Sequence, residues 1–158
     1  MIAKLLLEAT LDTLYMTFVS TFLAFIIGLG LAIILVITNK NGLKPNKAIY
    51  NALDIIVNTL RSFPFIILII VLFPFTKFIV GTSIGTTAAI VPLTIGSAPF
   101  IARLIENAMN EVDHGIIEAA LSYGATKTQI IFKVIFIEAL PSIINAITLT
   151  LIVVIGFT

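Results

Sequence analysis

The carboxylates that could serve as catalytic acids or bases gather in one stretch of the sequence, between two long apolar runs. They are Glu106, Glu111, Asp113, Glu118 and Glu138. A proton relay or a two-carboxylate active site inside a membrane needs such groups within an apolar segment, and the apolar runs carry hydroxyls but no carboxylate. The single histidine, His114, lies in the same stretch, where an isolated imidazole is interpreted as solvated. The sequence therefore predicts no catalytic residue.

The sequence also lacks the residues that usually bind a metal or a cofactor. The chain has no cysteine and one histidine, which excludes thiolate metal sites and leaves no cluster of metal ligands. It lacks the sequence G-x-x-x-x-G-K-[ST], so it has no P-loop of its own with which to bind and hydrolyse ATP. Its net charge of +1 is too small for the basic field of a nucleic-acid-binding protein. We therefore expect this chain itself to bind no metal, cofactor or nucleic acid.

The elements that hold these polar residues are predicted to be membrane-spanning helices. Hydrophobic residues make up 59% of the 158-residue chain and charged residues only 11%, with a mean hydropathy of +1.20. Soluble domains have roughly 45–50% apolar and about 25% charged residues. The composition therefore predicts an integral protein of the lipid bilayer, an all-α polytopic membrane protein with one transmembrane domain over residues 1–158.

Two of the predicted spans precede residue 77. Residues 14–37 carry no charge and are long enough to cross a bilayer as one helix. Residues 63–76 are too short to do so alone. The second span reaches full length if its helix begins near Ile49 or Asp54, with Arg61 extending to the interface or facing protein.

Two further spans follow. Residues 78–102 form the third, in which Pro92 and Pro99 are expected to produce kinks. These kinks serve as a hinge or a polar lining of a transporter, or they have no functional role. The fourth runs over residues 130–138 and continues without a charge over residues 139–158. Because the sequence is still apolar where it stops, we expect a fragment of a longer protein that has at least one more span.

The placement of lysine and arginine predicts which loops face the cytoplasm. Seven of the nine basic side chains lie around the first-to-second and third-to-fourth loops: Lys40, Lys44, Lys47, Arg61, Arg103, Lys127 and Lys133. Only Lys4 and Lys77 mark the other side. Because cytoplasmic loops carry the excess of basic residues, we expect both of these loops in the cytoplasm and the N-terminus outside.

Small residues recur every four positions in two of the spans. The two stripes are Ala24, Gly28 and Ala32 in the first span and Ser142, Ala146 and Thr150 in the fourth. Such stripes let helix backbones approach closely in lipid. Packing inside one subunit is preferred here over the lining of a moving interface or pathway.

A polar stretch, "EAALSYGATKTQIIFKVIFIEALP" at residues 118–141, has the signals of two short helices. Asp113 can cap a helix that starts at His114, and Gly124 can end that helix in a left-handed conformation. Thr126 and Gln129 form a capping-box pattern directly before an apolar run. The sequence therefore predicts a helix, a glycine turn and a second helix.

The first of these helices presents small side chains next to a carboxylate. Ala119, Ala120 and Ser122 lie beside Glu118. Small side chains suit insertion into a groove on another protein, and a carboxylate supplies one directional contact. The alternative is an ordinary cytoplasmic connector between two spans, and the residues alone leave both interpretations open.

Specific motifs in this stretch resemble a known family. "EAALSYGA" followed by "EALP" resembles the E-A-A-x-x-x-G motif, with a downstream Leu-Pro, of the permease subunits of bacterial ATP-binding-cassette importers. The segments "RSFPFIILII", "PFTKFIVGTSIG" and "AAIVPLTIGSAPFIARLIENAMNEV" resemble the methionine-import permeases within that family. The chain departs from many importers at Phe136 and Ile137, where they have a Leu-Pro, and keeps only the later Leu140 and Pro141.

The resemblance implies a type I importer fold of five spans, of which this chain holds four. It implies a homodimer of permeases in the bacterial inner membrane, a dimer of separate ATPase subunits that bind ATP and Mg, and an extracytoplasmic substrate-binding protein, often lipid-anchored. It also implies a cytoplasmic coupling loop over about residues 104–130, in which Glu118, Ala119, Ala120 and Gly124 dock on the ATPase.

The substrate implied by the resemblance is D- or L-methionine, with another amino acid or small polar solute as the alternative. Thr94, Ser97 and Asn145 are candidates for lining its path along the dimer axis. A stand-alone secondary transporter or an intramembrane enzyme is the rival class, and either would usually need a buried carboxylate, a positioned nucleophile or broken helices in matching halves. A structural helper subunit is a further alternative if the chain ends at Thr158.

Overall fold

The apolar stretches of the chain form long helices in the structure, a computed structural model that describes residues 2–158. The elements are α1 (Ile2–Thr38), α2 (Lys47–Ser62), α3 (Phe65–Val80), α4 (Thr86–Asn110), α5 (His114–Ser122), α6 (Lys127–Gln129), the π-helix η1 (Ile130–Ile135), α7 (Phe136–Glu138) and α8 (Leu140–Ile155). Residues 2–158 contain no β-strand, which confirms the all-α fold class.

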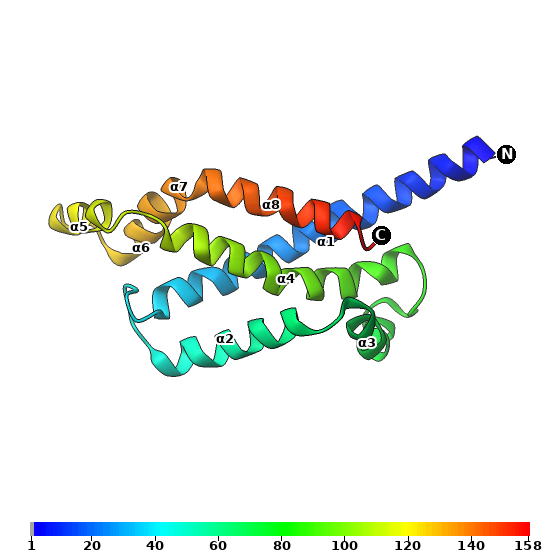
Figure 1. The fold of residues 1–158 in the computed structure, drawn as a ribbon, viewed down its shortest axis with the longest axis horizontal. Coiled ribbons are helices and arrows are strands. Elements are labelled where there is room, and N and C mark those ends of the chain that lie inside the picture. Colours follow the sequence, from blue (N-terminus) through cyan, green and yellow to red (C-terminus); the bar gives the residue numbers. More distant parts are fainter. Residues whose placement is uncertain (1) are drawn as a thin grey trace.

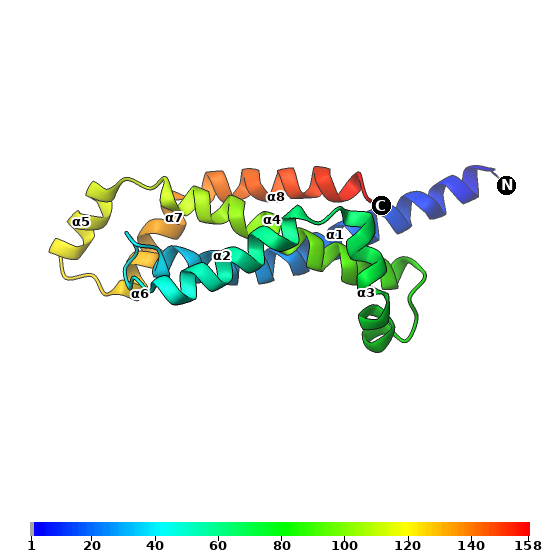
Figure 2. The ribbon, with the colours of Figure 1, turned by 60° about the horizontal axis from the view of Figure 1, so that its bottom comes forward.

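The central helix is α4, which contacts α1, α2, α3 and α8 (Figure 1). Figures 1 and 2 show α5 and α6 at the end of the molecule opposite the N-terminus and the C-terminus. The turn between α1 and α2 lies at the same end as α5. The two loops that carry most of the basic residues, and that were both predicted to face the cytoplasm, therefore lie at the same end of the molecule.

The stripe of small residues on α1 packs against α4. Ala24 and Ala32 are completely buried, and a Cβ added at Gly28 would lie 3.0 Å from the carbonyl oxygen of Ala98 and 3.1 Å from the nitrogen of Ala102. Because lipid offers no hydrophobic drive between helices, such close backbone approach gains its stability from dispersion contacts. The packing interpretation of this stripe is confirmed.

The stripe on α8 is only partly buried. Ala146 and Thr150 face the bundle, whereas Ser142 is exposed. The predicted packing role is therefore confirmed for two of its three members.

The second predicted span is a bent pair of helices rather than one continuous helix. α2 ends at Ser62, and α3 begins at Phe65 at an angle of 110° to it. Phe63 has φ −72° and ψ 132°, because the ring of Pro64 disfavours the helical conformation in the residue before it. The predicted start near Ile49 is close to the observed start at Lys47, but the expectation of one helix that continues through Pro64 is wrong.

The boundaries of the third span also differ from those predicted. α3 includes residues 78–80 and ends at Gly81, whose φ of 85° is left-handed. The third span therefore begins at Thr86, and it continues past Ala102 to Asn110. Pro92 and Pro99 lie inside α4 without ending it.

The helices are consistent with as many as four membrane crossings. α1 and α4 are each long and apolar enough to cross a membrane. The total reaches four if the bent pair α2 and α3 counts as one span and the pair Lys127–Glu138 and Leu140–Ile155 counts as another. The second pair is bent by 65°, and Pro141 lies in the first turn of α8, where a missing backbone N–H costs nothing.

Candidate functional site

The helix α5 is built by the local signals that its sequence contains. The Oδ1 atom of Asp113 accepts a hydrogen bond of 2.6 Å from the backbone N–H of Gly115 and so caps the first turn. Gly124 ends the helical segment with φ 79°, and the next N–H, of Ala125, donates to the carbonyl of Ala120 at 3.1 Å. The predicted N-cap and glycine stop are confirmed.

The second short helix begins as predicted but does not continue as a regular α-helix. The N–H of Thr126 donates to Gln129 Oε1 at 2.8 Å, and the N–H of Gln129 donates to Thr126 Oγ1 at 3.3 Å, which completes the capping box. The chain then widens into the π-helix Ile130–Ile135 before it returns to α-helical geometry in α7. Short π-helices inside α-helices are frequent at functional sites.

One face of α5 rests on the bundle, and the other is open. Ile117 and Ala120 pack against the hydrophobic core. None of the nine residues of α5 is itself buried. Glu118 and Ala119 are exposed, and Gly124 is exposed at the end of the helix. The four predicted coupling residues therefore lie on one short segment, with Ala120 turned partly toward the core and the other three toward the surface.

The open side of α5 also carries large apolar side chains. Ile116 is 41% exposed, Leu121 47% and Tyr123 92%. Within the part of the chain that the structure describes, Glu118 forms no ion pair. Apolar groups around one unpaired carboxylate form a surface that suits contact with another protein. Because α5 lies at one end of the molecule, this surface lies beyond the helical bundle (Figures 1 and 2).

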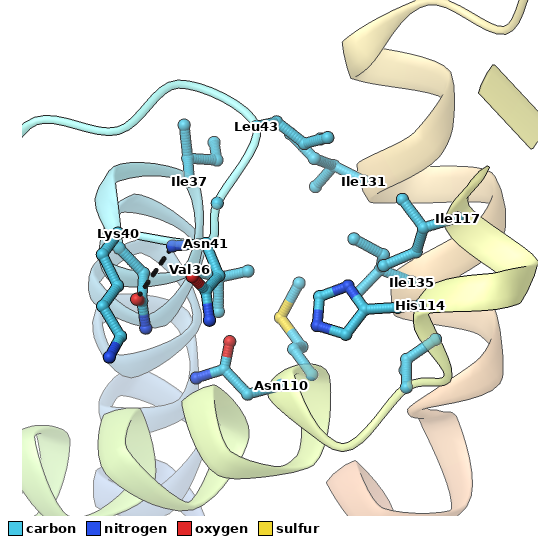
Figure 3. Close-up of a pocket in the computed structure, with 14 residues that line it drawn as sticks. Val36, Ile37, Lys40, Asn41, Leu43, Asn110, His114, Ile117, Ile131 and Ile135 are labelled. Carbon is cyan, nitrogen blue, oxygen red and sulfur yellow. Dashed lines mark hydrogen bonds between the residues drawn. The ribbon is translucent and has the colours of Figure 1, made fainter.

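A cavity of about 230 Å³ lies between α5, the end of α4, η1 and the turn after α1. Figure 3 shows side chains that approach it from α5 and η1 on one side and from α1 and its following turn on the other: His114, Ile117, Ile131, Ile135, Val36 and Asn41. No carboxylate lines the cavity, so it has no acid–base pair. His114 is exposed at its rim, as the solvated interpretation of this residue requires.

A hydrogen bond connects the two loops at this end. Lys127 Nζ donates to the carbonyl oxygen of Leu43 at 2.8 Å, from the start of α6 to the turn between α1 and α2. Among residues 2–158, no group of three or more histidine, cysteine, aspartate or glutamate side chains could hold a metal ion.

The three candidate path residues occupy different environments. Thr94 and Ser97 are each 6% exposed on α4, and the hydroxyl of Thr94 has no hydrogen-bond partner within the described chain. Ser97 also lines a cavity of about 230 Å³ near Arg61 and Phe100. Asn145 is exposed on α8. The three side chains therefore differ in exposure, with Thr94 and Ser97 buried and Asn145 at the surface.

A partly buried polar network between α2 and α4 was not predicted from the sequence. Arg103 Nη2 lies 2.5 Å from Asp54 Oδ1, and Arg103 Nη1 lies 2.6 Å from Glu106 Oε2. The hydroxyl of Tyr50 donates to Glu106 Oε1 at 3.3 Å, and Asn58 Oδ1 accepts from Arg103 Nη2 at 3.0 Å. All five of these side chains thus take part in bonds that join the two helices.

The position of Glu106 corrects a sequence-based expectation. Glu106 was expected in or beside a loop, yet it lies on α4 and is only 2% exposed. The apolar bundle therefore does contain a buried carboxylate, and Arg103 and Tyr50 supply its partners. The signal in the sequence is Tyr50, Asp54 and Asn58 at every fourth position of one helix, facing an Arg–Glu pair three positions apart on the other.

One protein-family model matches most of the chain. The family model described as "Binding-protein-dependent transport system inner membrane component" matches residues 24–158. The D-methionine transport system permease protein MetI of Escherichia coli (strain K12) is 51% identical over 98% of this chain and 71% of its own length. A probable D-methionine transport system permease protein MetI of Vibrio cholerae serotype O1 is 52% identical over 99% of this chain and 69% of its own length.

The fold is similar to that of a solved transporter. A chain in the native crystal form of the MetNI methionine ABC transporter, in an inward-facing conformation, superimposes with a TM-score of 0.96 at 50% identity. The match covers 99% of this chain and 72% of that chain.

Proposed function

The chain belongs to the family of binding-protein-dependent transport system inner membrane components, and from this we propose that it is the permease of an ATP-binding-cassette importer for methionine. The observation that carries the proposal is α5, a short helix at one end of the bundle with Glu118, Ala119, Leu121 and Tyr123 on an open surface. A helix without buried residues gains little from its own bundle, so its surface is best explained by a partner.

The proposed partner at α5 is a dimer of separate ATPase subunits, which bind ATP and Mg. Residues 104–130 form the coupling loop in this proposal, and Glu118, Ala119, Ala120 and Gly124 contact a groove on the ATPase. Closure of the two ATPase subunits around ATP moves the two coupling helices of a permease homodimer. The spans then change from an inward-open to an outward-open arrangement, and this chain contributes no chemical step.

Substrate is delivered by an extracytoplasmic binding protein and passes along the dimer axis in the bacterial inner membrane. Methionine as the substrate is supported by relatives at 51% and 52% identity that are named D-methionine transport system permeases. Its ammonium and carboxylate charges cancel, which suits a path lined by hydroxyl and apolar groups rather than by fixed charges. Thr94, Ser97 and Asn145 remain proposed lining residues.

The orientation proposed is that α5 and the turn after α1 face the cytoplasm, with the N-terminus outside. The supporting observation is that the turn between α1 and α2, which carries Lys40 and Lys44, lies at the α5 end of the molecule, where Lys127 of α6 donates a hydrogen bond to the carbonyl of Leu43. The positive-inside rule assigns such an end to the cytoplasm.

Reconstitution tests the function directly. The permease is placed in vesicles with its cognate ATPase and binding protein, and uptake of labelled D- and L-methionine is measured with and without ATP. ATP-dependent uptake that excess methionine suppresses, and other amino acids do not, is the expected result. Uptake of another amino acid without uptake of methionine would show that the proposed substrate is wrong. Uptake without any ATPase would refute the proposal that the protein belongs to an ATP-driven importer.

A further inference from the structure

The polar network between α2 and α4 occupies the place that apolar packing occupies between the other helices. Val57 is the only buried residue of α2. Glu106 is 2% exposed, and the side chains of Arg103 and Asp54 are 15% and 33% exposed. Because hydrophobic burial does not hold helices together in lipid, these ionic and hydrogen bonds carry much of the attachment of α2 to α4.

The same stretch of α4 is tied closely to α5. Only residues 111–113 separate α4 from α5, and Val112 among them is buried in the hydrophobic core. The helix is uninterrupted by proline between Pro99 and its end, and this part contains Arg103 and Glu106. A displacement of α5 is therefore passed on to the position of the Arg103 guanidinium.

We propose that the Arg103–Asp54 ion pair positions α2, and with it α3, so that they follow the movement of α4 and α5 during transport; this rests on the proposed importer function. Arg103 acts through Asp54 and touches no substrate, so it is a positioning residue. The charge-assisted hydrogen bonds of this ion pair are short and directional, which suits a contact that is made in one arrangement of the helices and broken in another. α3 follows α2 after a short break with a bend of 110°, so a displacement of α2 carries α3 with it.

The decisive variant is Asp54→Asn, because it removes the charge pair between the helices and leaves Arg103 paired with Glu106 on its own helix. The full transporter is reconstituted, and methionine transported per ATP hydrolysed is measured together with membrane incorporation and thermal stability. We expect this ratio to fall about tenfold, within the range seen when coupling residues are changed. Asp54→Glu keeps the charge and should restore at least half of the ratio.

Asp12→Asn is the matched control, since it is the same chemical change at an exposed carboxylate of α1 that forms no ion pair within residues 2–158. It should leave the ratio unchanged. If Asp54→Asn fails to assemble, Asn58→Ala keeps the ion pair but removes two bonds that support it at an exposed position: the 3.0 Å bond that Asn58 Oδ1 accepts from Arg103 and the 3.2 Å bond that Asn58 Nδ2 donates to Asp54. It should lower the ratio at least twofold.

The outcomes separate this inference from the proposed function. A wild-type complex that hydrolyses ATP without transporting methionine overturns the proposed function. A coupled wild type together with an unchanged ratio in Asp54→Asn, or an equal loss in Asp54→Glu and Asp54→Asn, overturns the positioning role alone.

Discussion

Replacing Gly124 by alanine changes the end of α5 through the backbone alone. Gly124 has φ 79°, and a Cβ added there would have no atom within 4 Å, so the substitution causes no collision. An L-residue in the left-handed region costs about 1–2 kcal/mol relative to glycine. The turn that ends α5 would then be populated about 5- to 30-fold less. Because the turn orients the exposed face of α5, binding of the ATPase should weaken by a similar factor.

The assay is titration of the ATPase subunit against solubilised permease, followed by ATP hydrolysis coupled to transport in vesicles. Gly81→Ala is a matched control, because Gly81 has φ 85° and equally open surroundings but ends α3 at the other end of the molecule. Both variants should lose the same stability, and only Gly124→Ala should lose ATPase affinity. Equal affinities for the two variants would refute the role of the turn in docking.

Three further predictions test the packing, the cap and the orientation. Gly28→Ala should lower the free energy of unfolding by about 1–3 kcal/mol, because the added Cβ meets the backbone of α4. Gly30→Ala should not lower it, because a Cβ added there has no atom within 4 Å. Thermal unfolding in detergent measures both variants. Asp113→Ala should cost about 1 kcal/mol at the start of α5, seen as faster amide exchange there while exchange in α4 stays unchanged. Because the chain has no cysteine, Thr82→Cys and Ser122→Cys each introduce a single site for labelling. A membrane-impermeant maleimide added to intact cells should modify the cysteine at position 82 and not the one at position 122. Labelling at position 122 would reverse the proposed orientation.

The sequence predicts α5 and its surroundings well because the interactions that form them are local. Asp113 caps α5 through a hydrogen bond from Gly115, two residues along the chain, and Thr126 and Gln129 bond to each other across three positions. The left-handed turn at Gly124 depends on that one residue. Each of these features is determined by a few neighbouring residues, so composition and spacing are enough to find it.

The bends and boundaries of the spans depend on contacts that the sequence does not display. A charge at Arg103 predicts the end of the third span at Ala102, yet α4 continues to Asn110, and Arg103 forms ion pairs with Asp54 and Glu106. The π-helix after Gln129 carries no sequence signal that distinguishes it from a regular helix. The roles of Glu118, Ala119 and Ala120 in docking stay a prediction.

The lack of burial along α5 has a consequence for how the protein matures in the cell. A nine-residue helix is too short to be stable by itself in water, and α5 has no buried residue to compensate. It therefore belongs to the part of the molecule that opens most readily, where amides exchange and proteases cut first. A partner that binds only the folded helix stabilises it by mass action. Permease that has not yet met its partner would thus be distinguished from assembled permease by its susceptibility to cleavage at this one helix.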